Sequence, residues 1–341
     1  MILVTGGTGM VGAHLLFQLV SSGEKIRATY RSKASFQKVK KVFGYYSEEA
    51  DKLFSKIDWV SADVADVPAL ETAFSGVTKV YHIAALVSFD EADAKKMRRV
   101  NIYGTANIVN LCVAHKVEKL CFVSSIASIA KAVQKSFIDE EDEFNLITNN
   151  YSYAITKYGA EMEVWRGAQE GLDVVIVNPG VILGPGFWKE NSGMLFTMGY
   201  KESPLFTEGV TGFVGVDDVV SVLIKGMNSS VKNERFVLVS ENISFKEVLF
   251  SIADSFEKKR PKIRVTDFIA AIGWRLSWLK SALTGAPNTF SKHTASSVNN
   301  KAYYDNSKTK EFFDFDFQNM DAVIQTICRQ FLKDKKAGLQ K

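Results

Sequence analysis

The first half of the chain alternates short apolar runs with longer segments whose apolar residues recur at helical spacing. Short runs rich in β-branched residues and bounded by turn residues predict strands. Strands that alternate with helices predict a parallel, doubly wound α/β sheet, and right-handed crossovers place the loops after the strands along one edge. The expected strands are Met1–Val4, Lys25–Tyr30, Ile57–Ala62, Val80–Ala84, Lys119–Ser124 and Val174–Val177.

The pattern changes after Pro179, where an irregular stretch runs to Gly212. A helix over Val216–Asn228 and a strand over Arg235–Val239 then resume the earlier alternation. Helical spacing returns twice more toward the end of the chain. These later helices are expected over Ser244–Phe256 and Met320–Leu332.

This change of pattern predicts two parts. We expect the large α/β domain over residues 1–178, with residues 213–240 returning to it. A smaller, mostly C-terminal lobe takes residues 179–212 and 241–332, and residues 333–341 form a tail. No flexible linker separates the parts, so we expect them to pack together with a substrate cleft between them.

A glycine-rich turn follows the first expected strand and precedes an amphipathic helix. In that context the glycines permit a tight turn, close approach of the backbone to a pyrophosphate, and close helix–strand packing. The helix amino terminus adds unpaired N–H groups and a partial positive charge for the phosphates. The pattern therefore predicts a Rossmann dinucleotide site. We assign it to Gly6, Thr8, Gly9, Met10, Val11 and Gly12.

The end of the second expected strand bears on the choice of cofactor. NAD-binding proteins usually place an acid about 20 residues after the glycines to bind the ribose hydroxyls. Here Thr29 and Tyr30 stand at that point, and Arg31 follows. A guanidinium can fork onto a 2′-phosphate that an acid would repel, and Lys38 could add a second cation. NADP(H) is therefore preferred, while NAD(H) and a plain solvated arginine stay open.

The ends of the third and fourth expected strands offer further cofactor contacts. Asp63 and Val64 could hold an adenine by a hydrogen bond and an apolar contact, although Asp63 could equally be a turn residue. The small side chains of Ala84 and Ala85 would let the backbone approach the cofactor closely. His82 lies inside the same strand, where a buried, hydrogen-bonded histidine is expected rather than a catalytic one.

A candidate catalytic set follows the fifth expected strand. That strand ends at Ser124 and Ser125, and Tyr153 and Lys157 are four residues apart on the next expected helix. Residues at this spacing share one helix face, so the ammonium should lower the pKa of the tyrosine from about 10. The Ser125 hydroxyl would bind the same substrate oxygen and steady a developing alkoxide. We expect Ser125, Tyr153 and Lys157 to be the catalytic residues.

Composition narrows the class of protein. The 341 residues carry a formal net charge of only +4, which does not favour a nucleic-acid partner. The three cysteines form no metal or disulfide pattern, so buried thiols in a reducing compartment and no metal site are expected. The sequence starts inside an expected strand and has no apolar run of transmembrane length, which favours a cytoplasmic protein.

These motifs, in this order, resemble the extended short-chain dehydrogenase/reductases of the NAD-dependent epimerase/dehydratase superfamily. The resemblance covers about residues 1–240. Arg31 and the serine-serine-isoleucine sequence at Ser124–Ile126 look closest to dihydroflavonol reductases and 3β-hydroxysteroid dehydrogenases. The matching stretches are Thr5–Gly12, Ala62–Asp66, Tyr81–Ala85, Asn101–Asn107, Phe122–Ser128, Tyr153–Lys157, Asn178–Gly186 and Phe213–Val219.

The resemblance implies residue roles. Tyr153 would give its proton to a carbonyl oxygen as hydride leaves the nicotinamide, and Lys157 would also hold the nicotinamide ribose. Pro179 and Val181 would line the nicotinamide, and Asn101 would support the helix beside the site. One departure is Asn178, which stands where this superfamily frequently has an arginine.

The resulting expectation is an NADP(H)-dependent oxidoreductase that reduces a carbonyl, or oxidises the matching alcohol, on a fairly apolar small molecule. A sugar-nucleotide epimerase with tightly bound NAD(P) and a non-catalytic NADP(H)-sensing regulator stay open, as does a homodimer. Phe268–Leu283 is apolar and could be a lid over the substrate, a membrane-surface helix or part of the core.

Overall fold

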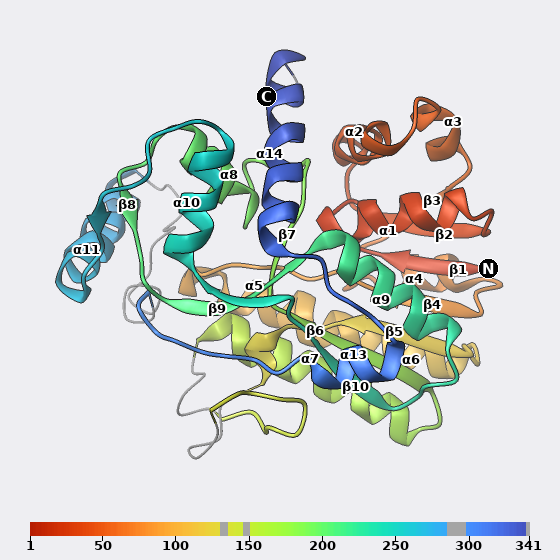
Figure 1. Ribbon diagram of the computed structural model, residues 1–341. Helices are drawn as coiled ribbons and strands as arrows, with labels where there is room; N and C mark the ends of the chain where they lie inside the picture. Colours follow the sequence, from red (N-terminus) through yellow and green to blue (C-terminus); the bar gives the residue numbers. More distant parts are fainter. Residues whose placement is uncertain (130–135, 146–150, 285–297, 339–341) are drawn as a thin grey trace.

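The computed structural model describes residues 1–129, 136–145, 151–284 and 298–338, except for the side chains of residues 276–284. Within these ranges the chain forms one large sheet covered by helices and a smaller group of elements beside it (Figure 1). No helix in the described ranges combines the length and the apolar character needed to cross a bilayer.

The large sheet has seven strands, and every neighbouring pair is parallel. The predicted doubly wound parallel sheet is therefore confirmed. The chain leaves β1 toward β2 on one side and later reaches β4 on the other, so the strand order reverses beside β1, the place where such sheets bind ligands. In spatial order the strands are β10 (Glu234–Leu238), β6 (Asp173–Pro179), β5 (Lys119–Val123), β4 (Lys79–His82), β1 (Ile2–Thr5), β2 (Ile26–Tyr30) and β3 (Asp58–Ser61).

Helices cover both faces of this sheet, because the buried strands are apolar on both sides. In β1, Ile2 and Val4 pack into the core on one face and Leu3 into the core on the other. The first core is shared with α1 (Met10–Ser21), α2 (Phe36–Tyr46), α3 (Ala50–Ser55) and α9 (Val216–Asn228). The second is shared with α4 (Val67–Phe74), α6 (Gly104–Ala114) and α7 (Ser152–Gln169).

A third core lies beside the sheet, among residues from the later part of the chain. Its aromatic centre is Trp188, Phe196, Phe256 and Phe331. Figure 1 shows α8, α10 and α14 grouped there. The elements are β7 (Val181–Leu183), α8 (Gly193–Tyr200), β9 (Val210–Gly215), β11 (Glu241–Ser244), α10 (Phe245–Ser255) and α14 (Met320–Lys336).

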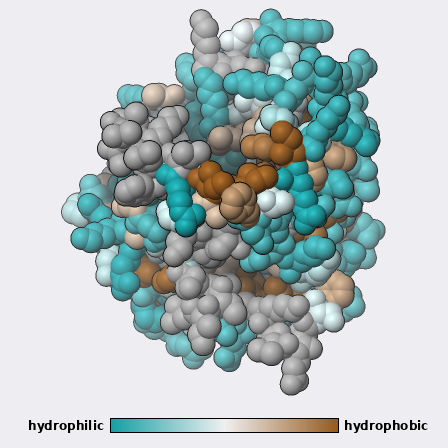
Figure 2. Space-filling model, turned by 90° about the vertical axis from the view of Figure 1, so that its left-hand side faces the viewer, coloured by the Kyte–Doolittle hydropathy of each residue, from teal (hydrophilic) through white to brown (hydrophobic). Residues whose placement is uncertain are grey.

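Two outlying parts complete the described chain. The short pair β8 (Leu205–Phe206) and β12 (Ile263–Arg264) lies near α11 (Asp267–Thr284), and α13 (Ser307–Phe313) packs on β10. Phe268 at the start of α11 is 74% exposed, so this end of the helix is not core. Figure 2 shows hydrophobic atoms gathered on the face that carries α11 and β8.

Several element boundaries differ from the sequence expectation. The helical segment before β5 is divided into α5 (Ala94–Met97), a π-helical turn η3 (Arg98–Tyr103) and α6. Strand β4 ends at His82, two residues before Ala84. Helix α14 continues to Lys336, beyond the expected end at Leu332, and Asp334 in its last turn is 2% exposed and accepts a hydrogen bond from Tyr45 of α2.

Candidate active site

The glycine loop joins β1 to α1 at the point where the strand order reverses. Gly6 has a φ of +72°, and a Cβ there would stand 2.6 Å from the backbone nitrogen of Ala84. A Cβ on Gly12 would stand 2.2 Å from the carbonyl oxygen of Gly6. Only glycine fits either position, so the backbone forms a close turn that a pyrophosphate can approach.

The amino terminus of α1 is open toward this turn. Its N-cap, Gly9, supplies no side-chain cap, and its first turn carries no acid. Thr8 and Met10 are partly exposed beside it, and Val11 is buried against the sheet. The uncapped N–H groups and the helix dipole suit an anion, so the described residues fit a dinucleotide phosphate.

The two cations expected for a 2′-phosphate lie in different settings. Arg31 follows β2 directly and is exposed. Lys38 lies on α2, where its ammonium is paired with the carboxylate of Glu190 and stands 5.8 Å from the centre of the Phe187 ring. The structure therefore leaves Arg31 accessible at the strand end, whereas Lys38 already has an acidic partner.

The residues after β3 and β4 line the same edge of the sheet. The Asp63 carboxylate accepts a hydrogen bond from the Ala65 N–H at 2.9 Å, so it also forms a turn. Val64 is buried against Gly104 of α6. Ala84 is brought against the glycine loop at Gly6, while Ala85 is exposed.

Pro179 and Val181 flank the point where the chain leaves the large sheet. Pro179 is the last residue of β6 and Val181 is the first of β7. A Cβ on Gly180 between them would stand 2.3 Å from the carbonyl oxygen of Gly212. This close crossing of β7 and β9 fixes both neighbouring side chains at the carboxyl edge of the sheet.

Ser125, Tyr153 and Lys157 come together at the carboxyl end of β5. Ser125 caps the short helix η4 (Ile126–Ser128), with its hydroxyl accepting from the Ala127 N–H at 3.1 Å. The same hydroxyl is hydrogen-bonded to the Tyr153 phenol. One turn further along α7, the Lys157 ammonium donates to the Val123 carbonyl at 2.8 Å and lies 4.5 Å from the centre of the Phe122 ring.

Burial governs the titration of this group. It raises the pKa of Tyr153 above its usual value, against the opposing effect of the Ser125 hydrogen bond. The predicted lowering of this pKa by Lys157 is therefore wrong, because desolvation of the phenolate is the larger effect. Burial lowers the pKa of Lys157 to about 7, against the opposing charge of Glu161. At neutral pH the tyrosine is thus a protonated acid above a lysine that is near its titration midpoint.

Polar residues next to the candidate triad support it. His82 is fully buried, and its ring nitrogens lie 2.7 Å from the Thr5 hydroxyl and 2.9 Å from the Thr105 hydroxyl, as expected of a core histidine. Asn101, within η3, accepts from the Leu86 N–H at 2.7 Å and donates to the Thr156 hydroxyl on α7 at 3.1 Å. The π-helical turn thereby anchors the tyrosine helix, a frequent use of such turns at functional sites.

Sequence reasoning missed Glu161. Its side chain has no exposed surface and accepts hydrogen bonds from Ser124, Ser128 and Asn178. The available signal was spacing, because residue 161 follows Lys157 by one helical turn, as Lys157 follows Tyr153. Its partners, however, come from β5, η4 and β6, which spacing does not reveal.

Two aromatic side chains lie near the ring of Tyr153. The ring centres of Phe89 and Tyr151 are each 6.4 Å from that of Tyr153. Phe89 is 51% exposed. A substrate that reaches Tyr153 therefore meets an aromatic wall.

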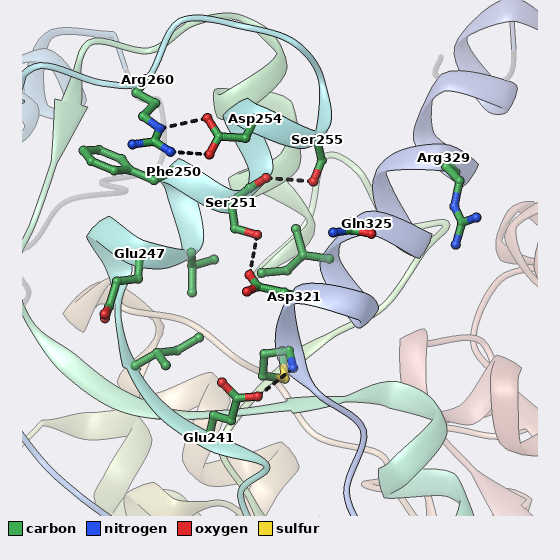
Figure 3. A pocket seen from close by; sticks show the side chains of 14 residues that line it. Glu241, Glu247, Phe250, Ser251, Asp254, Ser255, Arg260, Asp321, Gln325 and Arg329 are labelled. Atoms are coloured by element: carbon green, nitrogen blue, oxygen red, sulfur yellow. Dashed lines mark hydrogen bonds and ion pairs between the residues drawn. The ribbon is translucent and has the colours of Figure 1, made fainter.

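A pocket of about 820 Å³ lies elsewhere, between α10 and α14 (Figure 3). Its acidic side chains already have partners: Asp254 forms two hydrogen bonds with Arg260, and Asp321 accepts one from Ser251. Glu247 completes the capping box of α10. None of the expected cofactor or catalytic residues lines this pocket, and in the described ranges no cluster of potential ligands suits a metal ion.

Comparison with known proteins agrees with this geometry. The chain is 28% identical over 265 residues to sterol demethylase protein B of Methylococcus capsulatus, covering 77% of this chain and 76% of that protein. It is 28% identical over 264 residues to tetraketide alpha-pyrone reductase 2 of Arabidopsis thaliana, covering 72% and 80%. The fold matches UDP-glucose 4-epimerase of Thermotoga maritima with a TM-score of 0.77, at 19% identity over 98% of this chain and 99% of that one.

The profile of one NAD-binding family, described as male sterility protein, matches residues 4–230. That range contains the glycine loop and the Ser125, Tyr153 and Lys157 positions. The chain belongs to this NAD-binding family and is an oxidoreductase of the extended short-chain dehydrogenase/reductase type that uses a nicotinamide cofactor.

Proposed function

We propose that this enzyme reduces the carbonyl group of a fairly apolar small molecule with NADPH. The observation that carries the proposal is the hydrogen-bonded pair of Ser125 and Tyr153 with the Lys157 ammonium buried one turn below. This set stands at the carboxyl edge of the sheet, the same edge as the glycine loop. A cofactor held by that loop would reach the set along the edge.

The residues supply acid catalysis. Tyr153 is protonated at neutral pH because burial raises its pKa, so it can donate its proton to the carbonyl oxygen. The Ser125 hydroxyl is hydrogen-bonded to the phenol and would bind the developing alkoxide together with Tyr153. The charged form of Lys157 stabilises the phenolate left behind. When bound, a reduced nicotinamide would supply the hydride for the carbonyl carbon.

The remaining expected residues would hold the cofactor. Gly6 and Gly12, with Thr8, Gly9, Met10 and Val11, would bind the pyrophosphate, and Asp63 and Val64 would bind the adenine. Ala84 and Ala85 give close backbone approach, and Pro179 and Val181 would line the nicotinamide. The preference for NADP(H) rests on Arg31, an exposed guanidinium at the end of β2.

The substrate would lie between the sheet edge and the smaller lobe, formed by residues 179–212 and 241–332. The aromatic side chains of Phe89 and Tyr151 beside Tyr153 favour an apolar molecule. Two similar proteins, sterol demethylase protein B and tetraketide alpha-pyrone reductase 2, are named for substrates that agree with an apolar molecule.

Replacing Tyr153 with phenylalanine tests the chemistry. We expect NADPH binding, followed by cofactor fluorescence, to change less than twofold, because the substitution removes only one hydroxyl. Turnover should fall by about 10²–10⁴-fold, the contribution of a positioned general acid. NADPH oxidation with a panel of apolar ketones and aldehydes measures it. Retained turnover would refute the assigned acid, and tightly bound NAD(P) without net NADPH oxidation would favour an epimerase.

Replacing Arg31 with aspartate tests the cofactor preference. The carboxylate should repel a 2′-phosphate, so NADPH should bind at least tenfold more weakly while NADH binding changes much less. Arg31→Gln is the matched control, because it removes the positive charge without adding a negative one. An equal loss of affinity for both cofactors would contradict the assignment.

A further inference from the structure

Glu161 lies beneath the candidate catalytic set, in a site built around its carboxylate. Tyr153, Lys157 and Glu161 follow one another at four-residue spacing on α7 and share one face. Glu161 has no exposed surface, so its charge requires compensation by donors or a cation. The structure provides both, one set at each carboxylate oxygen.

One oxygen, Oε2, fixes the turn that carries Ser125. It accepts from the Ser124 hydroxyl at 2.6 Å, the Ser128 hydroxyl at 2.8 Å and the Asn178 amide at 2.9 Å. The same Asn178 amide also donates to the Ser125 carbonyl at 3.1 Å. Ser124 and Ser128, on either side of Ser125, are thus bound to the Glu161 carboxylate. The carbonyl of Ser125 is bound to Asn178, which also donates to that carboxylate.

The other oxygen, Oε1, lies 3.0 Å from the guanidinium of Arg235 on β10. Arg235 is itself held in place, because it donates to the carbonyl oxygens of Glu140 at 2.7 Å and Asp142 at 2.9 Å. Glu140 in turn accepts from the Val237 N–H at 2.6 Å. The ion pair is therefore fastened to the edge strand of the sheet and to the segment before α7.

Few other charges face Lys157. His82 on β4 is electrostatically coupled to it, but burial lowers the pKa of His82 to about 3, so this ring is neutral at working pH. The β5 groups in contact are the Val123 carbonyl and the Phe122 ring, which are uncharged. The groups that η4, β6 and β10 contribute here are bonded to Glu161, and they are Ser128, Asn178 and Arg235. Glu161 is the anion whose field favours the ammonium form of Lys157.

We propose that Glu161 is a positioning residue of the active site, which holds the Ser125 turn with one carboxylate oxygen and keeps Lys157 cationic through its charge. The role in catalysis rests on the proposed function, whereas the effect on the charge of Lys157 does not. Arg235 limits that effect by sharing the carboxylate. Asn178 stands where this superfamily frequently has an arginine. It donates to Oε2 of Glu161 and so helps to hold the Ser125 turn without adding a positive charge.

The test is the pH dependence of Glu161→Gln, which keeps the shape of the side chain and removes its charge. The activity for carbonyl reduction should fall as pH rises through the pKa of Lys157, because the phenolate then loses its cation. In Glu161→Gln this falling limb should move about one pH unit to the acid side, which is a tenfold change in the ratio of charged to neutral lysine. Glu161→Asp keeps the charge and should lower the rate without moving the limb.

Glu163→Gln is the matched control, because Glu163 lies on the same helix but pairs with Arg166 at the surface. It should leave both the rate and the pH profile unchanged. A loss of activity by the same factor at every pH in Glu161→Gln, with an unmoved limb, would reduce Glu161 to a structural residue and overturn the proposal.

A measurement without substrate separates this inference from the proposed function. NMR of protein labelled with ¹³C-lysine follows the Cε chemical shift of Lys157, and hence the neutral fraction of this buried amine, across pH. The midpoint should lie about one pH unit lower in Glu161→Gln than in the parent and should not change in Glu163→Gln. An unmoved midpoint would refute the proposal even if the enzyme reduces carbonyls. A moved midpoint without any carbonyl turnover would support the charge effect and refute the proposed function instead.

Discussion

The buried lysine should cost the protein stability, and the cost should depend on pH. Lys157 has 2% of its surface exposed, and burial lowers its pKa from 10.5 to about 7. Between these values the unfolded chain binds a proton that the folded protein does not, so the parent becomes more stable as pH rises through this window. At about 1.4 kcal/mol per pKa unit, the weaker proton binding of Lys157 in the folded protein destabilises the fold by about 4–5 kcal/mol at pH 6 and by about 2 kcal/mol at pH 9.

Lys157→Met removes the charge and keeps most of the side-chain volume. It also removes the donor to the Val123 carbonyl, which costs about 1–3 kcal/mol at any pH. We therefore expect the variant to be about 2–3 kcal/mol more stable than the parent at pH 6 and nearly equal to it at pH 9.

Urea unfolding of both proteins at pH 6 and pH 9, without cofactor, measures this difference through the transition midpoints. Lys52→Met is the control, because Lys52 is 66% exposed on α3 and pairs with a neighbouring glutamate. Its effect should stay within about 0.5 kcal/mol at both pH values. A stability difference for Lys157→Met that is the same at pH 6 and pH 9 would refute the argument.

Two further substitutions probe the fold around the site. Gly12→Ala places a Cβ 2.2 Å from the Gly6 carbonyl oxygen, so it should destabilise the fold by about 1–3 kcal/mol and weaken NADPH binding at least tenfold in a fluorescence titration. Gly44→Ala, in open space on α2, should instead stabilise by about 0.5–1 kcal/mol. Asp334→Asn removes a buried carboxylate that accepts from Tyr45 and pairs with Lys41, and should cost about 2–3 kcal/mol in urea unfolding. Unchanged stability in Gly12→Ala or Asp334→Asn would contradict these contacts.

Periodicity predicted the sheet well because it reports which residues are buried. The strands of the large sheet were expected within a few residues of their observed bounds, since a strand buried on both faces is a continuous apolar run. The glycine turn was equally predictable, because a side chain at Gly6 or Gly12 would collide with backbone atoms of the turn or the neighbouring strand end.

Features that depend on contacts between residues far apart in the sequence could not be predicted. Strands β7, β9 and β11 form a small sheet from segments that looked irregular, because each is short and finds its neighbours only in the folded chain. The pKa of Tyr153 was predicted in the wrong direction, since the distance along a helix shows which charges are near but not how much water is excluded. The pairing of Glu161 likewise depends on residues far away in the sequence.

The ion pair of Glu161 and Arg235 has a consequence for how the chain is made. The two residues are 74 positions apart, and α7 is synthesised well before β10. Until β10 has left the ribosome, a carboxylate destined for the interior has no cation, and the sheet ends at β6 with an open edge. The nascent large domain therefore cannot neutralise the buried Glu161 carboxylate by itself. Its folding during synthesis must wait for β10, which follows part of the smaller lobe in the sequence. Pausing translation before residue 234 should accordingly yield a chain that chaperones retain.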